Sequence, residues 1–72
     1  MDKVPLGYYR HFKKGDIYRV LLIAKHEKTR EDFVIYQSTI GDLEIWVRSM
    51  GHFLEEVDVH GKKVPRFQYI PE

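Results

Sequence analysis

LEIWVRSMGHF, residues 43–53, begins with a strict alternation of side-chain type. Successive side chains of an extended strand point to opposite faces, so Ile45 and Val47 share one face. Trp46, the only tryptophan of the chain, shares the other face with charged neighbours such as Arg48. The pattern predicts a β-strand whose aliphatic side is buried, and it raises the question of what a tryptophan does on the charged side.

Four further segments have the β-branched and aromatic composition, or the alternation, of strands. Glycine-containing turn signals separate several of them, because glycine accepts the positive φ of tight turns. The five expected strands are residues 17–24, 33–38, 43–48, 56–59 and 63–70. Between the third and the fourth, Gly51 interrupts residues 49–55, where we expect a single 3₁₀ or helical turn. Because Pro65 lacks an N–H, the last strand should lie at an edge or start beyond the proline.

This order of elements predicts an all-β fold in which the strands close into a small barrel. With 72 residues the chain forms one domain over residues 1–72, and residues 1–7 read as a loose lead-in. A chain of this length buries only roughly 60% of the surface that its unfolded form exposes. We expect the core to consist of Val20, Leu22, Val34, Tyr36, Ile45, Val47, Phe53, Val57 and Val59.

The strand at residues 17–24 is apolar on both faces through Leu21 and Ile23. Its outer face therefore needs a cover, for which we consider the C-terminal segment 67–70 or a second copy of the chain. Self-association is left open on this ground.

The composition excludes several classes of protein. Twelve lysines and arginines oppose eleven acidic residues, so the overall charge does not favour nucleic acid. The longest apolar run has five residues, whereas a membrane helix needs about 20. No cysteine is present, which excludes disulfides and fits a reducing compartment. Without an apolar leader segment, we expect a cytoplasmic protein that has no membrane partner.

Several short motifs occur in a characteristic order: Y-R-H-F-K at 9–13, W-V-R at 46–48 and G-K-K-V-P-R-F at 61–67. Over about residues 7–67 they resemble the small bacterial "domain of unknown function 1653" family. The resemblance implies an SH3-like β-barrel and no established activity. Three positions depart from the family pattern, where a glycine, a proline and an apolar residue are usual: Lys14, Ser49 and His52.

Trp46 admits two interpretations. It covers an open end or outer face of the barrel, or it is displayed as a docking platform, since tryptophan and arginine are enriched in binding hot spots. The segment Y-Y-R-H-F-K at 8–13 interleaves aromatic and basic residues in the same way, and it too can serve either structure or binding. The candidate binding residues are Trp46, Arg48, Tyr9, Arg10 and His11.

No pattern in the chain indicates catalysis. Nothing in the sequence places a base beside the hydroxyls of Ser38 and Ser49. Glu55 and Glu56 are adjacent, so they point to opposite faces of an extended chain. The four histidines are scattered, which argues against a metal site. We therefore expect no enzyme, no metal and no cofactor. The sequence favours a binding module for a protein or peptide, with nucleic acid or a nucleotide as the alternative.

Overall fold

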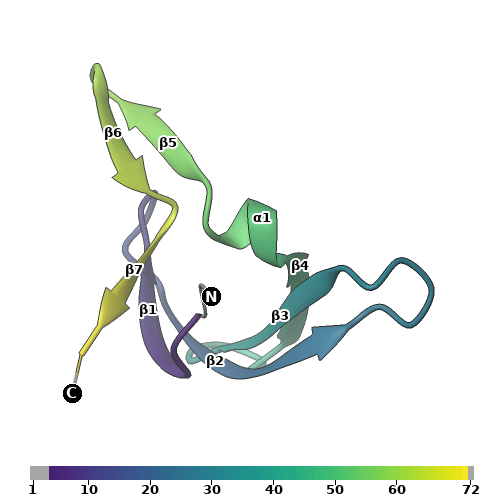
Figure 1. Cartoon of the computed structure of the whole chain (residues 1–72). Coiled ribbons are helices and arrows are strands. Elements are labelled where there is room, and N and C mark those ends of the chain that lie inside the picture. The colour runs from purple at the N-terminus through teal and green to yellow at the C-terminus, as the bar shows by residue number, and fades with distance from the viewer. Residues whose placement is uncertain (1–3, 72) are drawn as a thin grey trace.

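Seven strands and one short helix make up the computed structural model, which describes residues 4–71 (Figure 1). The elements are β1 (Gly7–His11), β2 (Ile17–Lys25), β3 (Asp32–Ser38), β4 (Ile45–Ser49), α1 (Met50–Phe53), β5 (Glu56–Val59), β6 (Lys62–Pro65) and β7 (Phe67–Ile70). The all-β class and the single short helical turn are confirmed. The strand at β1 was not predicted, because its aromatic and basic residues show no regular alternation of apolar and polar side chains.

The strands form two antiparallel sheets. The larger has the order β4-β3-β2-β1-β7, and the smaller is the β5–β6 hairpin, which projects away from it (Figure 1). The predicted strand 63–70 is in fact two strands that separate at Arg66. The Arg66 N–H donates to the Glu55 carbonyl at 3.0 Å, and from there β7 leaves the hairpin to pair with β1.

The larger sheet is strongly curled. Its two edge strands, β4 and β7, would lie about 19 Å apart in a flat sheet with ordinary strand spacing. Yet Cζ of Arg48, on β4, lies 5.7 Å from the ring centre of Phe67, on β7. The sheet therefore bends until side chains from opposite edges meet over its concave face.

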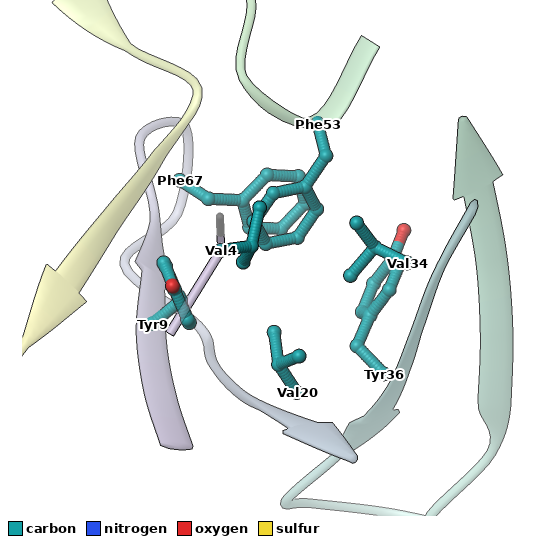
Figure 2. Packing of buried hydrophobic residues seen from close by; sticks show 7 residues of the cluster. All are labelled: Val4, Tyr9, Val20, Val34, Tyr36, Phe53 and Phe67. Carbon is teal, nitrogen blue, oxygen red and sulfur yellow. The ribbon is translucent and has the colours of Figure 1, made fainter. Parts of the chain in front are cut away.

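Phe53 packs at the centre of the core (Figure 2). It is 1% exposed. Its ring stacks on Phe67 with centroids 4.3 Å apart and meets Tyr9 edge-on at 5.2 Å. Ser49 caps the helix that carries Phe53 by accepting from the His52 N–H at 3.3 Å. The whole buried cluster is Val4, Tyr9, Val20, Val34, Tyr36, Phe53 and Phe67.

The N-terminal lead-in is partly structural. Residues 1–3 lie outside the described part of the chain, but Val4 is buried in the core rather than loose. The Tyr9 hydroxyl donates to the Pro5 carbonyl at 2.7 Å, which ties the lead-in to β1.

Part of the predicted core is on the outer face. A bulge between Val20 and Leu22 shifts the register of β2 by one residue, so Leu22 points outward and Ile23 packs against the core. Ile23 is therefore not on the outer face that was expected to need a cover. Leu22 lies there instead and is 49% exposed, and the C-terminal segment pairs with β1 rather than covering this face.

The alternation predicted for β4 is correct, but its faces are reversed. Ile45 and Val47 are exposed, Val47 by 63%, while Arg48 lies in register with the fully buried Val34. The reason is the aromatic content of the concave face, which accommodates Trp46 and Arg48 next to Tyr36 and Phe67. Two other members of the predicted core, Val57 and Val59, are partly buried in the β5–β6 hairpin.

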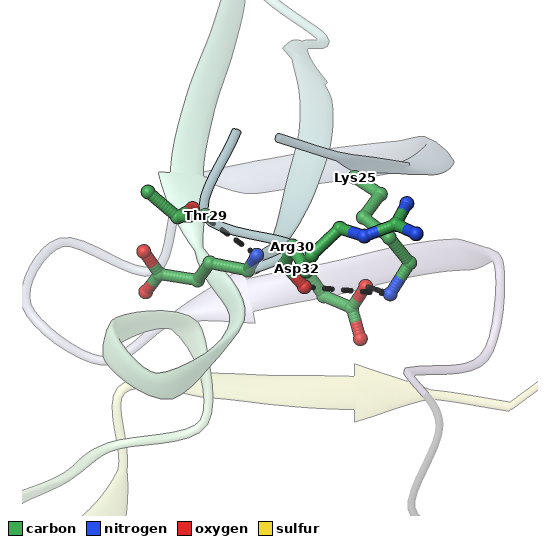
Figure 3. A network of polar contacts seen from close by, with 5 residues as sticks. Lys25, Thr29, Arg30 and Asp32 are labelled. Atoms are coloured by element: carbon green, nitrogen blue, oxygen red, sulfur yellow. Dashed lines mark hydrogen bonds and ion pairs between the residues drawn. The ribbon is translucent and has the colours of Figure 1, made fainter. Parts of the chain in front are cut away.

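The β5–β6 turn and the β2–β3 connection are explained by the residues within them. His60 and Gly61 join β5 to β6 with φ of 52° and 80°, as a two-residue turn of type I′ requires. In the polar β2–β3 connection, Lys25 Nζ binds Asp32 Oδ1 at 2.7 Å, and Thr29 Oγ1 accepts a backbone N–H (Figure 3). This connection is fully exposed, as predicted for residues 25–32, apart from Asp32 at the start of β3.

Replacing Phe53 with alanine should unfold the domain or lower its free energy of unfolding by about 3–5 kcal/mol, because a large aromatic cavity opens at the centre of a small core. Leu54→Ala is the matched control, since Leu54 is the next residue and is exposed. Urea denaturation followed by circular dichroism measures both. Equal effects of the two substitutions would show that the core is not centred on Phe53.

The reversed faces of β4 can be tested with one substitution at two valines. Val34→Ala should lower the free energy of unfolding by about 2–3 kcal/mol, since Val34 is 0% exposed. Val47→Ala should lower it by less than about 1 kcal/mol, because only strand propensity is lost at an exposed position. A larger loss at Val47 in the same denaturation experiment would restore the original prediction.

Candidate functional site

A cleft of about 210 Å³ opens on the concave face of the larger sheet. We call it the aromatic–basic cleft, and its lining residues are His11, Tyr18, Tyr36, Trp46, Arg48 and Phe67. Each of the five strands of the sheet supplies at least one of these side chains. The walls therefore belong to hydrogen-bonded strands, which hold the cleft in shape without a ligand.

Trp46 forms part of the wall and is 47% exposed. It lies opposite Tyr36 in the β3–β4 register, on the face that points into the curl of the sheet. The covering role and the displayed position considered for Trp46 are therefore compatible, because part of the indole is packed and the remainder is open to the cleft.

Arg48 brings a positive charge to the same wall. Its Nε donates to the Tyr36 hydroxyl at 3.4 Å, and its guanidinium lies over the Phe67 ring. Such a cation–π contact holds the planar group in one orientation. The two ion pairs among the described residues are Lys25–Asp32 and Arg66–Glu55, so Arg48 has no carboxylate partner there.

His11 lies at the end of β1, and its ring packs edge-on against Phe67 at 4.9 Å. Burial lowers its pKa below the ordinary value of 6.5, and the charges of Arg48 and Arg66 lower it further. Lys13 acts in the same direction and Asp16 in the opposite one. The imidazole is therefore neutral at pH 7.

The hydroxyl of Tyr18 also belongs to the cleft. Burial raises its pKa, and Asp16 and Tyr36 raise it further, against the opposing effect of Arg48. Tyr18 therefore stays protonated at neutral pH and can donate a hydrogen bond.

Of the five candidate binding residues, three come together in the cleft: Trp46, Arg48 and His11. Tyr9 does not join them, since it is buried against Phe53, and burial together with Tyr69 raises its pKa to about 12. Arg10 points to a separate depression of about 320 Å³ between β1 and the β5–β6 hairpin, where Phe12 also lies.

Three lining residues, Tyr18, Tyr36 and Phe67, were not among the candidate binding residues, although Tyr36 was predicted as a core residue. Alternation could have suggested Tyr18, because it shares a strand face with the predicted core residue Val20. Phe67 could not be placed in this way, because the break at Arg66 separates β7 from the strand predicted before it. His52 is exposed.

Residues 4–71 contain neither a metal-binding cluster nor a membrane-spanning helix. No three histidine, cysteine, aspartate or glutamate side chains come close enough together to hold a metal ion. Within the same residues, no helix has the length and apolar character to span a membrane.

The sequence model of the family described as "Protein of unknown function (DUF1653)" matches residues 7–69. The chain belongs to the DUF1653 family. A crystal structure of a DUF1653 protein from Bordetella bronchiseptica is similar, with a TM-score of 0.81 and 32% identity over 97% of this chain and 96% of that one. Comparison with the curated proteins finds no match.

The resemblance drawn from the sequence motifs is thereby confirmed for nearly the whole DUF1653 chain. All six residues that line the aromatic–basic cleft fall inside the matched range of residues 7–69. The cleft is thus built from the DUF1653 domain itself and not from a flanking segment.

The lowered pKa of His11 predicts a pH dependence of stability. Below pH 6.5 the unfolded chain takes up a proton at His11 more readily than the folded chain does. The free energy of unfolding should therefore be highest above this pH and fall as the pH drops through the lowered pKa of the folded state.

Urea denaturation at a series of pH values between about 5 and 8 measures this dependence. His11→Gln should flatten it, whereas His52→Gln, at an exposed histidine, should leave it unchanged. The same slope in His11→Gln as in the wild type would assign the dependence to other groups.

Proposed function

We propose that this DUF1653 domain is a non-catalytic binding module that holds a peptide segment in the aromatic–basic cleft. The observation that carries the proposal is the half-exposed Trp46 on a concave, aromatic wall beside Arg48, which has no carboxylate partner within residues 4–71. Tryptophan and arginine dominate binding hot spots because they bury large areas and place directed donors. Their position on paired strands limits the ordering entropy that a partner must overcome.

The size of the cleft favours a side chain of a peptide over a whole cofactor. Small-molecule sites usually enclose roughly 300–1,000 Å³. The cleft encloses about 210 Å³, which suits one or two side chains of an extended segment. As an analogy at the level of fold alone, SH3-like barrels also bind partners beside aromatic side chains.

The non-catalytic part of the proposal rests on how the polar groups are used. The Ser38 hydroxyl donates to the Ile40 carbonyl at 2.9 Å, and the Ser49 hydroxyl caps α1. The Glu55 carboxylate is paired with Arg66 at 2.9 Å. These groups serve local structure rather than forming a nucleophile–base pair.

Nucleic acid or a nucleotide is the second candidate, favoured by the combination of open aromatic rings with a guanidinium. The near balance of charge, twelve basic against eleven acidic residues, argues against a long polyanion. We infer a bacterial cytoplasmic setting from the absence of cysteine and from the bacterial source of the similar structure.

Selection of a random peptide library on the purified domain tests the proposal, with Trp46 fluorescence as the readout because it is the only indole. Selected peptides should change the emission of Trp46 in the wild type. Labelled copies of the same peptides, followed by fluorescence anisotropy, should lose binding to Trp46→Ala. That variant should remain folded, since its side chain is half open. Tyr8→Ala, at an exposed aromatic outside the cleft, is the control that should keep binding.

The salt dependence of the binding affinity distinguishes a peptide ligand from a nucleic acid. Peptide affinity should change less than about tenfold between 50 and 200 mM salt, whereas a ligand making 6–10 phosphate contacts loses roughly 10³–10⁵-fold. A pool of single-stranded oligonucleotides is therefore assayed in parallel. Binding by the oligonucleotides alone, or selected peptides that bind Trp46→Ala equally well, would overturn the proposal.

A further inference from the structure

The polar groups of the aromatic–basic cleft are mainly hydrogen-bond donors. Arginine and tryptophan can only donate hydrogen bonds, and the two tyrosine hydroxyls and the imidazole can donate as well. None of the six lining residues carries a carboxylate. A ligand that offers acceptors, and above all a negative charge, would satisfy this set of donors.

Arg48 supplies the positive charge that such a ligand would neutralise. It is half-buried, it lies over the Phe67 ring, and its one hydrogen bond among the described residues comes from Nε. Its terminal nitrogens have no acceptor among residues 4–71. Arg66 differs, because Nη2 already binds Glu55 at 2.9 Å. The net charge of the cleft wall therefore comes from Arg48.

His11 adds a directed donor. Its Nδ1 accepts the Lys13 backbone N–H at 3.2 Å, so the neutral ring carries its proton on Nε2. No described residue accepts a hydrogen bond from Nε2. An anion bound beside Arg48 would also oppose the positive charges around the ring, and the pKa of His11 would then rise.

The surroundings favour a singly charged group over a phosphate. Asp16 is close enough to act on both His11 and Tyr18, so a dianion would meet repulsion at this side of the cleft. A guanidinium and a carboxylate match as two planar forks with parallel hydrogen bonds. The aromatic walls formed by Trp46, Tyr18 and Phe67 fit an apolar side chain next to that carboxylate.

We propose that the aromatic–basic cleft recognises a peptide carboxylate, bound by Arg48, together with the apolar side chain that adjoins it. This inference rests on the proposed peptide-binding function and adds the chemical class of the recognised group. The carboxylate can come from a chain terminus or from an acidic side chain, and the choice of probes separates these two sources.

Three small probes isolate the charge: N-acetyl-glycyl-phenylalanine with a free carboxylate, its C-terminal amide, and N-acetyl-glutamyl-phenylalanine amide. Binding is measured by Trp46 fluorescence and by the ¹H–¹⁵N NMR spectrum. The wild type should bind a carboxylate probe about tenfold or more tightly than the amide, because a charge-assisted bidentate pair is lost with the amide. The free acid binding better indicates a terminus, and the glutamyl probe binding better indicates a side chain.

Arg48→Gln should reduce the affinity for carboxylate probes to that for the amide, and Arg48→Lys should restore only part of the difference, since the paired geometry is absent. Arg19→Gln removes an arginine that lies over Tyr8, outside the cleft, and should keep the full difference. The pKa of His11, followed through its ring proton, should rise with a carboxylate probe and stay unchanged with the amide.

Equal binding of acid and amide at the cleft would overturn carboxylate recognition and leave the peptide-binding function standing. A preference for the acid that survives in Arg48→Gln would overturn the role of Arg48. Adenosine monophosphate is titrated as a fourth probe, and its binding without binding of any peptide probe would overturn the proposed function itself. Absence of binding by every probe at millimolar concentration would also overturn carboxylate recognition.

Discussion

The stack of Phe53 on Phe67 is the contact on which the rest of the domain depends. It joins α1 to β7, the strand at one edge of the curled sheet, with ring centres 4.3 Å apart. Because Tyr9 and Tyr36 pack on the same pair, two further strands are fixed by it. A domain this small has little other apolar volume, so its stability is concentrated in these rings.

The same closure creates the aromatic–basic cleft. Where the rings of Phe67 and Tyr36 leave the core, their outer parts become walls, and Arg48 reaches across from the opposite edge strand. The site and the core thus share residues. A substitution of Phe67 would affect both together, whereas Trp46 and Arg48 can be changed with less effect on the fold because they lie at its open side.

Sequence periodicity located most strands but not their orientation. For β4 it separated Ile45 and Val47 from Trp46 and Arg48 correctly, yet aliphatic character suggested the wrong face as buried. The inner surface is a ring-lined curl that accepts a half-exposed indole, and only tertiary structure reveals this. In β2, the bulge after Val20 exchanges the inward and outward faces of the residues that follow it. The sequence does not reveal this bulge, because an inserted residue has no signature in an entirely apolar run. Three of the five candidate site residues nevertheless met, since each came from a segment dense in rings and cations.

The pairing of β1 with β7 has a consequence for folding during synthesis. The first strand of the chain forms its second ladder only with the last, so this contact has a very large separation in sequence. During synthesis, at about 5–20 residues per second, the edge of β1 that pairs with β7 stays unpaired until Phe67 has emerged, and Tyr9 lacks part of its core packing. A chain released before that point would contain strands that precede β7 but lack both the ring that completes the core and the neighbour that shields β1. Such early termination products are candidates for aggregation and rapid degradation.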